Sequence, residues 1–96
     1  MSDLQVMHAR EGKKGRYYIL HADGESSLTY SVASDALVIA DHTEVAAGHQ
    51  GEGIGLLMLQ ELIADARSKG FQIVPLCPFV NAQRRKHPEW SDVFSV

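Results

Sequence analysis

The run from His42 to Gly55, HTEVAAGHQGEGIG, constrains the fold of this chain more than any other segment. It begins in an apolar stretch that predicts a strand, and it ends where apolar residues start to recur with helical spacing. Three glycines at alternate positions, Gly51, Gly53 and Gly55, open that helix. A glycine loop at a helix N-terminus aims unpaired backbone N–H groups at one point, and such a point binds anions, above all phosphates. We therefore expect a strand, a loop and a helix that share an anion site.

The remaining pattern predicts an α+β fold around this unit. Strands are expected over residues 4–9, 16–22, 28–32, 36–45 and 71–76, and helices over residues 54–69 and 78–86. The strand at 36–45 should be the longest and buried on both faces, because its start is almost continuously apolar. A strand, a helix and a strand joined by short links are typical of a parallel crossover. The other strands follow through short turns, so the order β-β-β-β-α-β-α gives a mostly antiparallel sheet with one parallel junction.

Length and composition indicate one domain spanning residues 1–96. A chain of 96 residues buries one modest core. Its net charge of −3 argues against a nucleic-acid partner, and no apolar run is long enough for a membrane span. The first residues lack the pattern of a secretory signal, and a single cysteine excludes an internal disulfide. We therefore expect a cytoplasmic protein without a nucleic-acid, membrane or metal partner.

Three phosphate-loop patterns can be compared with the glycine run. A Walker loop requires a lysine and a hydroxyl residue where Ile54 and Gly55 stand. A dinucleotide fingerprint requires a third glycine where Leu56 stands. The pattern Q/R-x-x-G-x-G/A, after a strand and at the start of a helix, is satisfied at every position from Gln50 to Gly55.

That third pattern is the pyrophosphate loop of the GNAT acetyltransferase superfamily, which this chain resembles. The resemblance extends to HTEV before the loop, AR-x-x-G at the helix end, and CPFV and HPEW further on, so it covers roughly residues 16–94. Together these segments look like the small, single-domain branch of N-acetyltransferase-like proteins. The resemblance implies a compact GNAT-like fold, acetyl-coenzyme A or coenzyme A as co-substrate without a metal, and an amine acceptor, either a small molecule or a lysine-type amine.

The resemblance also implies which residues bind the coenzyme. The pantetheine arm should pair with backbone near Val45, where two strands splay apart, and Asn81 should contact the same arm. The loop residues expected around the pyrophosphate are Gln50, Gly51, Glu52, Gly53, Ile54 and Gly55. Glu52 stands where relatives often carry a basic residue, and a carboxylate there repels phosphates unless it points outward.

Transfer of an acetyl group to an amine requires a neutral amine, a polarised thioester carbonyl and a proton source for the departing thiolate. His42 and Glu44 are two apart on a strand, so they share one face and are candidate bases. They could equally be a polar pair at the end of a sheet.

Cys77 precedes Pro78 and is therefore expected at the N-terminus of the second helix, where the helix dipole favours a thiolate. It could be a nucleophile that carries the acetyl group, a proton donor to coenzyme A, or a small buried hydrophobe. The tyrosine that the superfamily often uses as general acid has no counterpart between Phe79 and His87.

The sequence thus favours an acetyl-coenzyme A-dependent N-acetyltransferase that acts directly or through Cys77. The alternative is a coenzyme A-binding module with little or no catalytic activity, because the chain is short and lacks the usual tyrosine. In a third interpretation, the glycines serve only a tight turn and close helix packing.

Overall fold

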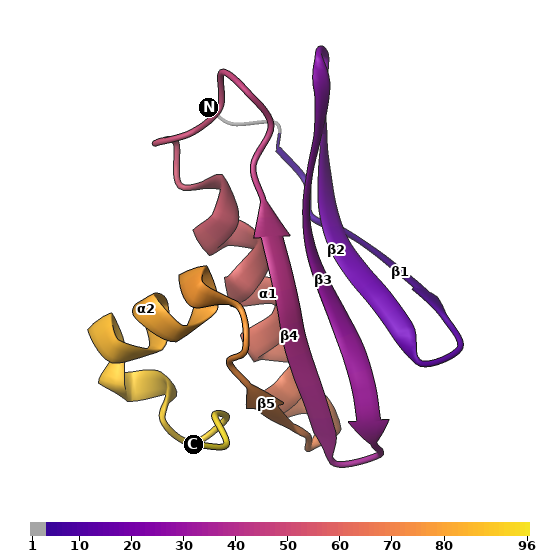
Figure 1. Ribbon diagram of the computed structural model, residues 1–96, viewed down its shortest axis with the longest axis vertical. Coiled ribbons are helices and arrows are strands. Elements are labelled where there is room, and N and C mark those ends of the chain that lie inside the picture. The colour runs from indigo at the N-terminus through magenta and orange to yellow at the C-terminus, as the bar shows by residue number, and fades with distance from the viewer. Residues whose placement is uncertain (1–3) are drawn as a thin grey trace.

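The computed structural model describes residues 4–96 and contains one five-stranded sheet with two α-helices (Figure 1). The strands are β1 (Met7–Glu11), β2 (Lys14–His21), β3 (Gly24–Ser34), β4 (Leu37–Glu44) and β5 (Gln72–Val74). The helices are α1 (Ile54–Lys69), α2 (Pro78–Lys86) and a short 3-10 turn, η1 (Pro88–Trp90). Within residues 4–96, no helix combines the length and apolarity that a membrane span requires.

The sheet has the strand order β1-β2-β3-β4-β5, and the predicted α+β topology is confirmed. The first four strands are antiparallel neighbours, while β4 and β5 are parallel because α1 carries the chain back between them. The C-terminal segment then lies against β5, where the Ile73 N–H donates to the Val93 carbonyl (2.7 Å) and the Ser95 N–H donates to the Ile73 carbonyl (2.8 Å).

Both α-helices have the bounds that the sequence predicts. Gly70 ends α1 in a left-handed conformation (φ +80°), and its N–H donates to the Ala66 carbonyl. Pro78 occupies the first turn of α2, where its missing N–H breaks no helical bond. Local signals therefore determine the end of α1 and the start of α2, which is why the sequence predicts them well.

The bounds of all five strands differ from the expected ranges, and two further expectations about the strands are wrong. The longest strand is β3, with 11 residues, whereas β4 has 8. In addition, β4 is not buried on both faces: Val38 and Ala40 are buried, but Ile39 between them is only half-buried. The apolar run is explained by one buried face and a second face that is only partly covered. In sequence it looks like a strand that is buried on both faces, although β4 is not.

The core lies between the sheet and the helices. Helix α1 packs on β2 and β3, and α2 packs on β4. Near the end of the chain, Trp90 is buried with Val93 and Phe94. The buried apolar side chains from the sheet are Tyr17, Ile19, Leu28, Tyr30, Val38, Ala40 and Ile73, and those from α1 are Ile54, Met58, Leu59, Leu62, Ile63 and Ala66.

A β-bulge in β4 determines which side chains point toward the helices. Tyr30 pairs with Ala40 and Thr29 pairs with His42, so Asp41 has no partner residue in β3. The Asp41 carboxylate accepts a hydrogen bond from the Ser31 hydroxyl (2.6 Å) instead. After the bulge, Thr43 lies opposite buried Leu28 and faces the helices, so its neighbours in β4 face the open side of the sheet.

Leu62→Ala tests the packing of α1, because Leu62 is fully buried. The lost contacts and the cavity left behind should lower the free energy of unfolding by about 2–5 kcal/mol. Leu57→Ala is the matched control: Leu57 lies on the same helix but is 37% exposed, and its loss should be below about 1 kcal/mol. Urea denaturation measures both, and equal losses would contradict this arrangement of α1.

Candidate functional site

Strands β4 and β5 part at the centre of the molecule. Their parallel pairing covers only Leu37–Ile39 and Gln72–Val74. The last hydrogen bond that joins β4 to the chain leaving β5 runs from the Cys77 N–H to the Ala40 carbonyl (2.8 Å). In the described part of the chain, the second half of β4 thus has no strand on this side. Its edge is available for hydrogen bonding where the carboxyl ends of the two parallel strands diverge.

The loop after β4 leads into the start of α1 through two glycines in a left-handed conformation. Gly51 has φ +84° and Gly53 has φ +79°, values that residues with a Cβ rarely adopt. Gly53 is the N-cap of α1, and no side chain caps this helix end. The first helical N–H donor is that of Leu57, which donates to the Gly53 carbonyl (3.0 Å). The preceding N–H groups of α1 therefore point out of the helix with the positive end of its dipole.

Gly55 has a different role from the other two glycines. A Cβ at this position would lie 2.8 Å from the ring of Phe79, so the missing side chain lets α2 pack against the first turn of α1. At Gly51 and Gly53, by contrast, a Cβ would meet no atom within 4 Å. Close helix packing thus explains Gly55. Gly51 and Gly53, in contrast, shape the loop and leave open space beside it.

A cavity of about 320 Å³ lies beside this loop, between the start of α1 and the start of α2. Its lining residues are Val45, His49, Gln50, Gly51, Gly53, Ile54, Gly55, Leu56, Phe79 and Gln83. The structure therefore brings together Val45 and all the predicted loop residues except Glu52. Asn81, predicted to contact the pantetheine arm, does not line this cavity, and its side-chain carbonyl accepts a hydrogen bond from Arg84 Nε (2.8 Å).

Four lining residues are absent from the sequence prediction: His49, Leu56, Phe79 and Gln83. Phe79 and Gln83 are four apart on α2 and so share one face of that helix. Their spacing in the sequence indicates a shared helix face, but only the packing of α2 on Gly55 shows that this face borders the loop. His49 directly precedes Gln50, and nothing in its sequence context marks it as a partner of the loop.

The candidate catalytic residues lie on two sides of the parted strands. Cys77 is only 2% exposed. Its Sγ lies 3.3 Å from the Thr43 Oγ1, on the side of β4 that faces the helices. His42 and Glu44 are exposed and lie on the opposite face of β4, as the register of the bulged strand requires. The structure thus pairs Cys77 with Thr43, which the sequence prediction did not include, and not with the two candidate bases.

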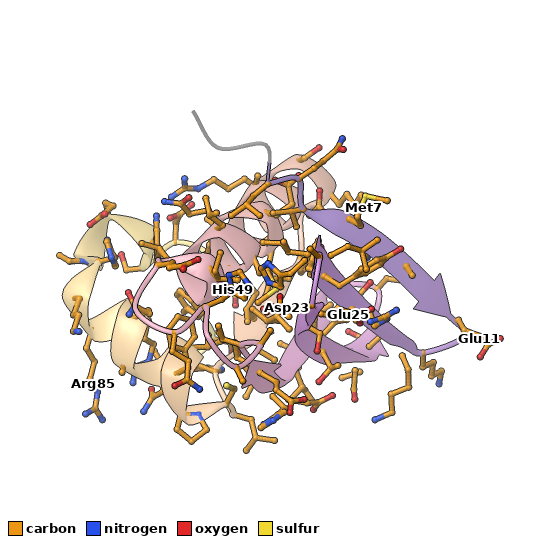
Figure 2. All side chains as sticks on the ribbon, turned by 90° about the horizontal axis from the view of Figure 1, so that it is seen from above. Met7, Glu11, Asp23, Glu25, His49 and Arg85 are labelled. Carbon is orange, nitrogen blue, oxygen red and sulfur yellow. The ribbon has the colours of Figure 1, made fainter. Side chains whose placement is uncertain are left out.

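His49 connects the loop to the β2–β3 turn. Its Nδ1 lies 3.0 Å from a Glu52 carboxylate oxygen, and its Nε2 lies 3.1 Å from a carboxylate oxygen of Asp23. Figure 2 shows His49 and Asp23 side by side. The hydrogen bonds to Glu52 and then to Asp23 raise the pKa of His49, and the bond to His49 lowers the pKa of Asp23. Glu52, the least favourable residue of the predicted phosphate loop, is therefore held by the His49 ring.

A buried serine also holds the loop between β4 and α1 in place. Ser26 is fully buried, and its hydroxyl oxygen accepts a hydrogen bond from the Ala46 N–H (2.9 Å). The His21 Nε2 lies 2.8 Å from the same oxygen. The His21 ring stacks on the His49 ring at 3.9 Å between centroids. The loop is thus attached to the β2–β3 hairpin through both side chains and backbone.

A second polar cluster lies at the other end of α1. The Tyr17 hydroxyl donates to an Asp65 carboxylate oxygen (2.6 Å), and the His8 Nε2 lies 2.6 Å from the Tyr30 hydroxyl. Burial raises the pKa of Tyr17 and lowers the pKa of His8. The first contact joins β2 to α1, and the second joins the edge strand β1 to β3. Across residues 4–96, no three His, Cys, Asp or Glu side chains gather in a way that could hold a metal ion.

The contact between Gly55 and Phe79 can be measured as a coupling. Gly55→Ala should be less favourable in the native background than in the Phe79→Leu background, because only the native ring meets the added methyl group. The expected difference in the free energy of unfolding is about 1 kcal/mol or more. Thermal or urea denaturation of the two single variants and the double variant gives this value, and additive effects would contradict the contact.

Comparison with known proteins agrees with this arrangement. A GCN5-like putative N-acetyltransferase from Staphylococcus aureus, whose solution structure is known, is 25% identical and superposes with a TM-score of 0.74, over 99% of this chain and 91% of that one. No curated protein matches the chain. The model of the GCN5-related N-acetyl-transferase family matches residues 16–93. Both the expected resemblance and the expected fold are thus confirmed, and the chain belongs to the GCN5-related N-acetyl-transferase family.

Proposed function

We propose that this protein transfers the acetyl group of acetyl-coenzyme A to an amine, and that the pyrophosphate of the coenzyme binds beside the Gln50–Gly55 loop. One observation carries the proposal: the uncapped start of α1 opens onto a cavity whose wall is this loop. Backbone N–H groups at a helix N-terminus bind phosphate oxygens without any cationic side chain. The family of the chain supports the reaction class, and the cavity supports the place of the coenzyme.

The gap between β4 and β5 suits the pantetheine arm. Pantetheine is an extended chain with two amides, and it can add to an open strand edge much as a peptide does. The free half of β4 offers such an edge, and Val45 continues it into the cavity at the loop. With the pyrophosphate at the loop and the arm along β4, the thioester would reach the region of Thr43 and Cys77.

The chemistry follows from the two sides of β4. The amine nitrogen attacks the thioester carbon, the new C–N bond forms, and the C–S bond breaks as the thiolate leaves and takes up a proton. We assign removal of the amine proton to Glu44 or His42 on the open face. Cys77 is buried against Thr43, which leaves little room for an acetyl group on its sulfur. Its burial therefore supports direct transfer, with Cys77 as a wall or proton donor.

The open face of the sheet offers a route for the acceptor. A cavity of about 520 Å³ lies there, lined by Ala9, Arg10, Glu11, Lys14, Gly15, Arg16, Thr29, Tyr30 and Asp41. Thr29 pairs with His42, so the cavity adjoins one of the candidate bases. A small-molecule amine or a lysine-type amine that entered here would approach β4 from the side of Glu44.

A coenzyme A-binding module with little catalysis is the second candidate. It is favoured by the separation of the candidate bases from Cys77, since they lie on opposite faces of β4. Calorimetric titration with coenzyme A tests the part that both candidates share, and release of free thiol from acetyl-coenzyme A with a panel of amines separates them. Binding without amine-dependent thiol release would favour the module, and no binding would contradict both.

Glu44→Gln tests the assignment of the base. If Glu44 removes the proton, the variant should lose about a hundredfold or more in kcat at neutral pH and bind coenzyme A unchanged. Glu61→Gln removes an equally exposed carboxylate from α1 and should leave turnover unchanged. The same measurement on His42→Gln tells the two candidate bases apart. Full activity in both variants would show that neither residue removes the amine proton.

Cys77→Ala tests direct transfer. Turnover should persist in this variant, because no covalent bond to sulfur is needed. The rate should fall by less than about tenfold if Cys77 is only a wall, and by about a hundredfold or more if it protonates the departing thiolate. Mass spectrometry of the wild-type protein after reaction with acetyl-coenzyme A provides the complementary measurement. An acetyl group on Cys77 that is passed on to the amine, together with an inactive Cys77→Ala variant, would contradict direct transfer.

A further inference from the structure

His49 occupies a distinctive position in the loop that borders the cavity. It lines the cavity itself, and both of its ring nitrogens face carboxylates, Glu52 on the same loop and Asp23 on the β2–β3 turn. A neutral imidazole carries one N–H, whereas an imidazolium carries two. Two carboxylate partners therefore match the protonated ring, which donates to both of them.

The surroundings of His49 contain few other charges. Its ring stacks on His21, which projects from β2. The cavity-lining residues that come from α1 and α2 are Ile54, Gly55, Leu56, Phe79 and Gln83, and none of them is charged. Glu52 does not line the cavity itself, but it lies between Gly51 and Gly53, which both do. His49 is thus the one titratable side chain among the described residues that line the cavity, and the carboxylates of Glu52 and Asp23 lie directly behind it as its partners.

We propose that the protonated His49 neutralises Glu52 at the phosphate loop, and that its protonation controls how tightly the coenzyme binds. This inference rests on the proposed place of the pyrophosphate. A charged His49 holds Glu52 and Asp23 in ion pairs, ties the loop to the hairpin and offsets their repulsion of the phosphates. Loss of the proton leaves two carboxylates beside the anion site and removes one of the two donors that fix the loop.

The raised pKa of His49 determines whether the affinity for the coenzyme rises or falls with pH. The carboxylates raise the pKa of His49 above its ordinary value of 6.5. The ring is therefore charged at pH values below its raised pKa, and it loses its proton as the pH rises through that pKa. The affinity for the coenzyme should be constant on the acid side and fall on the alkaline side, by roughly two- to fivefold, the range that exposed charge pairs usually reach.

The experiment is a calorimetric titration with dephospho-coenzyme A, repeated between about pH 5.5 and 8.5 at constant ionic strength. This ligand lacks the 3′-phosphate, a monoester whose second proton is lost near pH 6. Its pyrophosphate keeps the same charge throughout, so a pH effect belongs to the protein. In the wild type, Kd should rise with pH by the factor given above.

Four variants locate the effect. His49→Gln should bind with the weaker, alkaline Kd at every pH, and His49→Lys, whose charge is fixed, should keep the tighter Kd at high pH. Glu52→Gln should bind tightly and lose most of the pH dependence, because the repulsive carboxylate is gone. His87→Gln is the matched control: His87 also pairs with an exposed glutamate, Glu89 (2.9 Å), but does not line the cavity, so its pH profile should match the wild type.

The outcomes distinguish this inference from the proposed function. Binding of dephospho-coenzyme A with a Kd that is flat in pH, or with an unchanged pH profile in His49→Gln, would overturn the role of His49 and leave the coenzyme site intact. No binding at any pH would overturn the coenzyme site and, with it, this inference. If His49→Gln fails to fold, the profiles of Glu52→Gln and His49→Lys still decide the question.

Discussion

The early parting of β4 from β5 is the constraint on which the rest of the structure depends. Parallel pairing ends at Ile39, and the hydrogen bond from Cys77 to the Ala40 carbonyl turns the chain away from the sheet and into α2. This turn leaves half of β4 without a neighbouring strand on its β5 side and brings α2 onto the first turn of α1, where Gly55 admits the ring of Phe79. The open edge of β4 and the position of α2 beside the cavity are thus consequences of one short strand, while Gly53 leaves the start of α1 uncapped.

The bulge in β4 gives the parted strands two chemically different sides. Because Asp41 is unpaired in the register, Thr43 faces Cys77, and His42 and Glu44 face the open sheet. An extended ligand lying between the strands would meet a thiol and a hydroxyl on one side and an imidazole and a carboxylate on the other. The proposed reaction uses this division, since the departing thiolate and the incoming amine have opposite proton requirements.

Much of this architecture could be predicted from the sequence, because its signals are local. Gly70 and Pro78 determine helix ends through their own backbone conformations, and the alternation of glycines marks the loop before α1. The strand lengths, the bulge and the side on which Thr43 lies depend on pairing between distant segments, which no local pattern encodes. The same holds for His49: its two carboxylate partners come from its own loop and from a turn 26 residues away in sequence.

The central claim is that the start of α1 and its loop bind the pyrophosphate of coenzyme A. The most direct measurement is the change in backbone amide chemical shifts of the ¹⁵N-labelled protein during titration with coenzyme A. If the pyrophosphate binds at this loop, the largest shifts should occur at the amides of Gly51–Leu56, with further shifts at Thr43 and Cys77 along the gap between β4 and β5. Saturable shifts confined to other parts of the molecule, such as the cavity around Arg16 and Asp41, or no shifts at all, would contradict this claim.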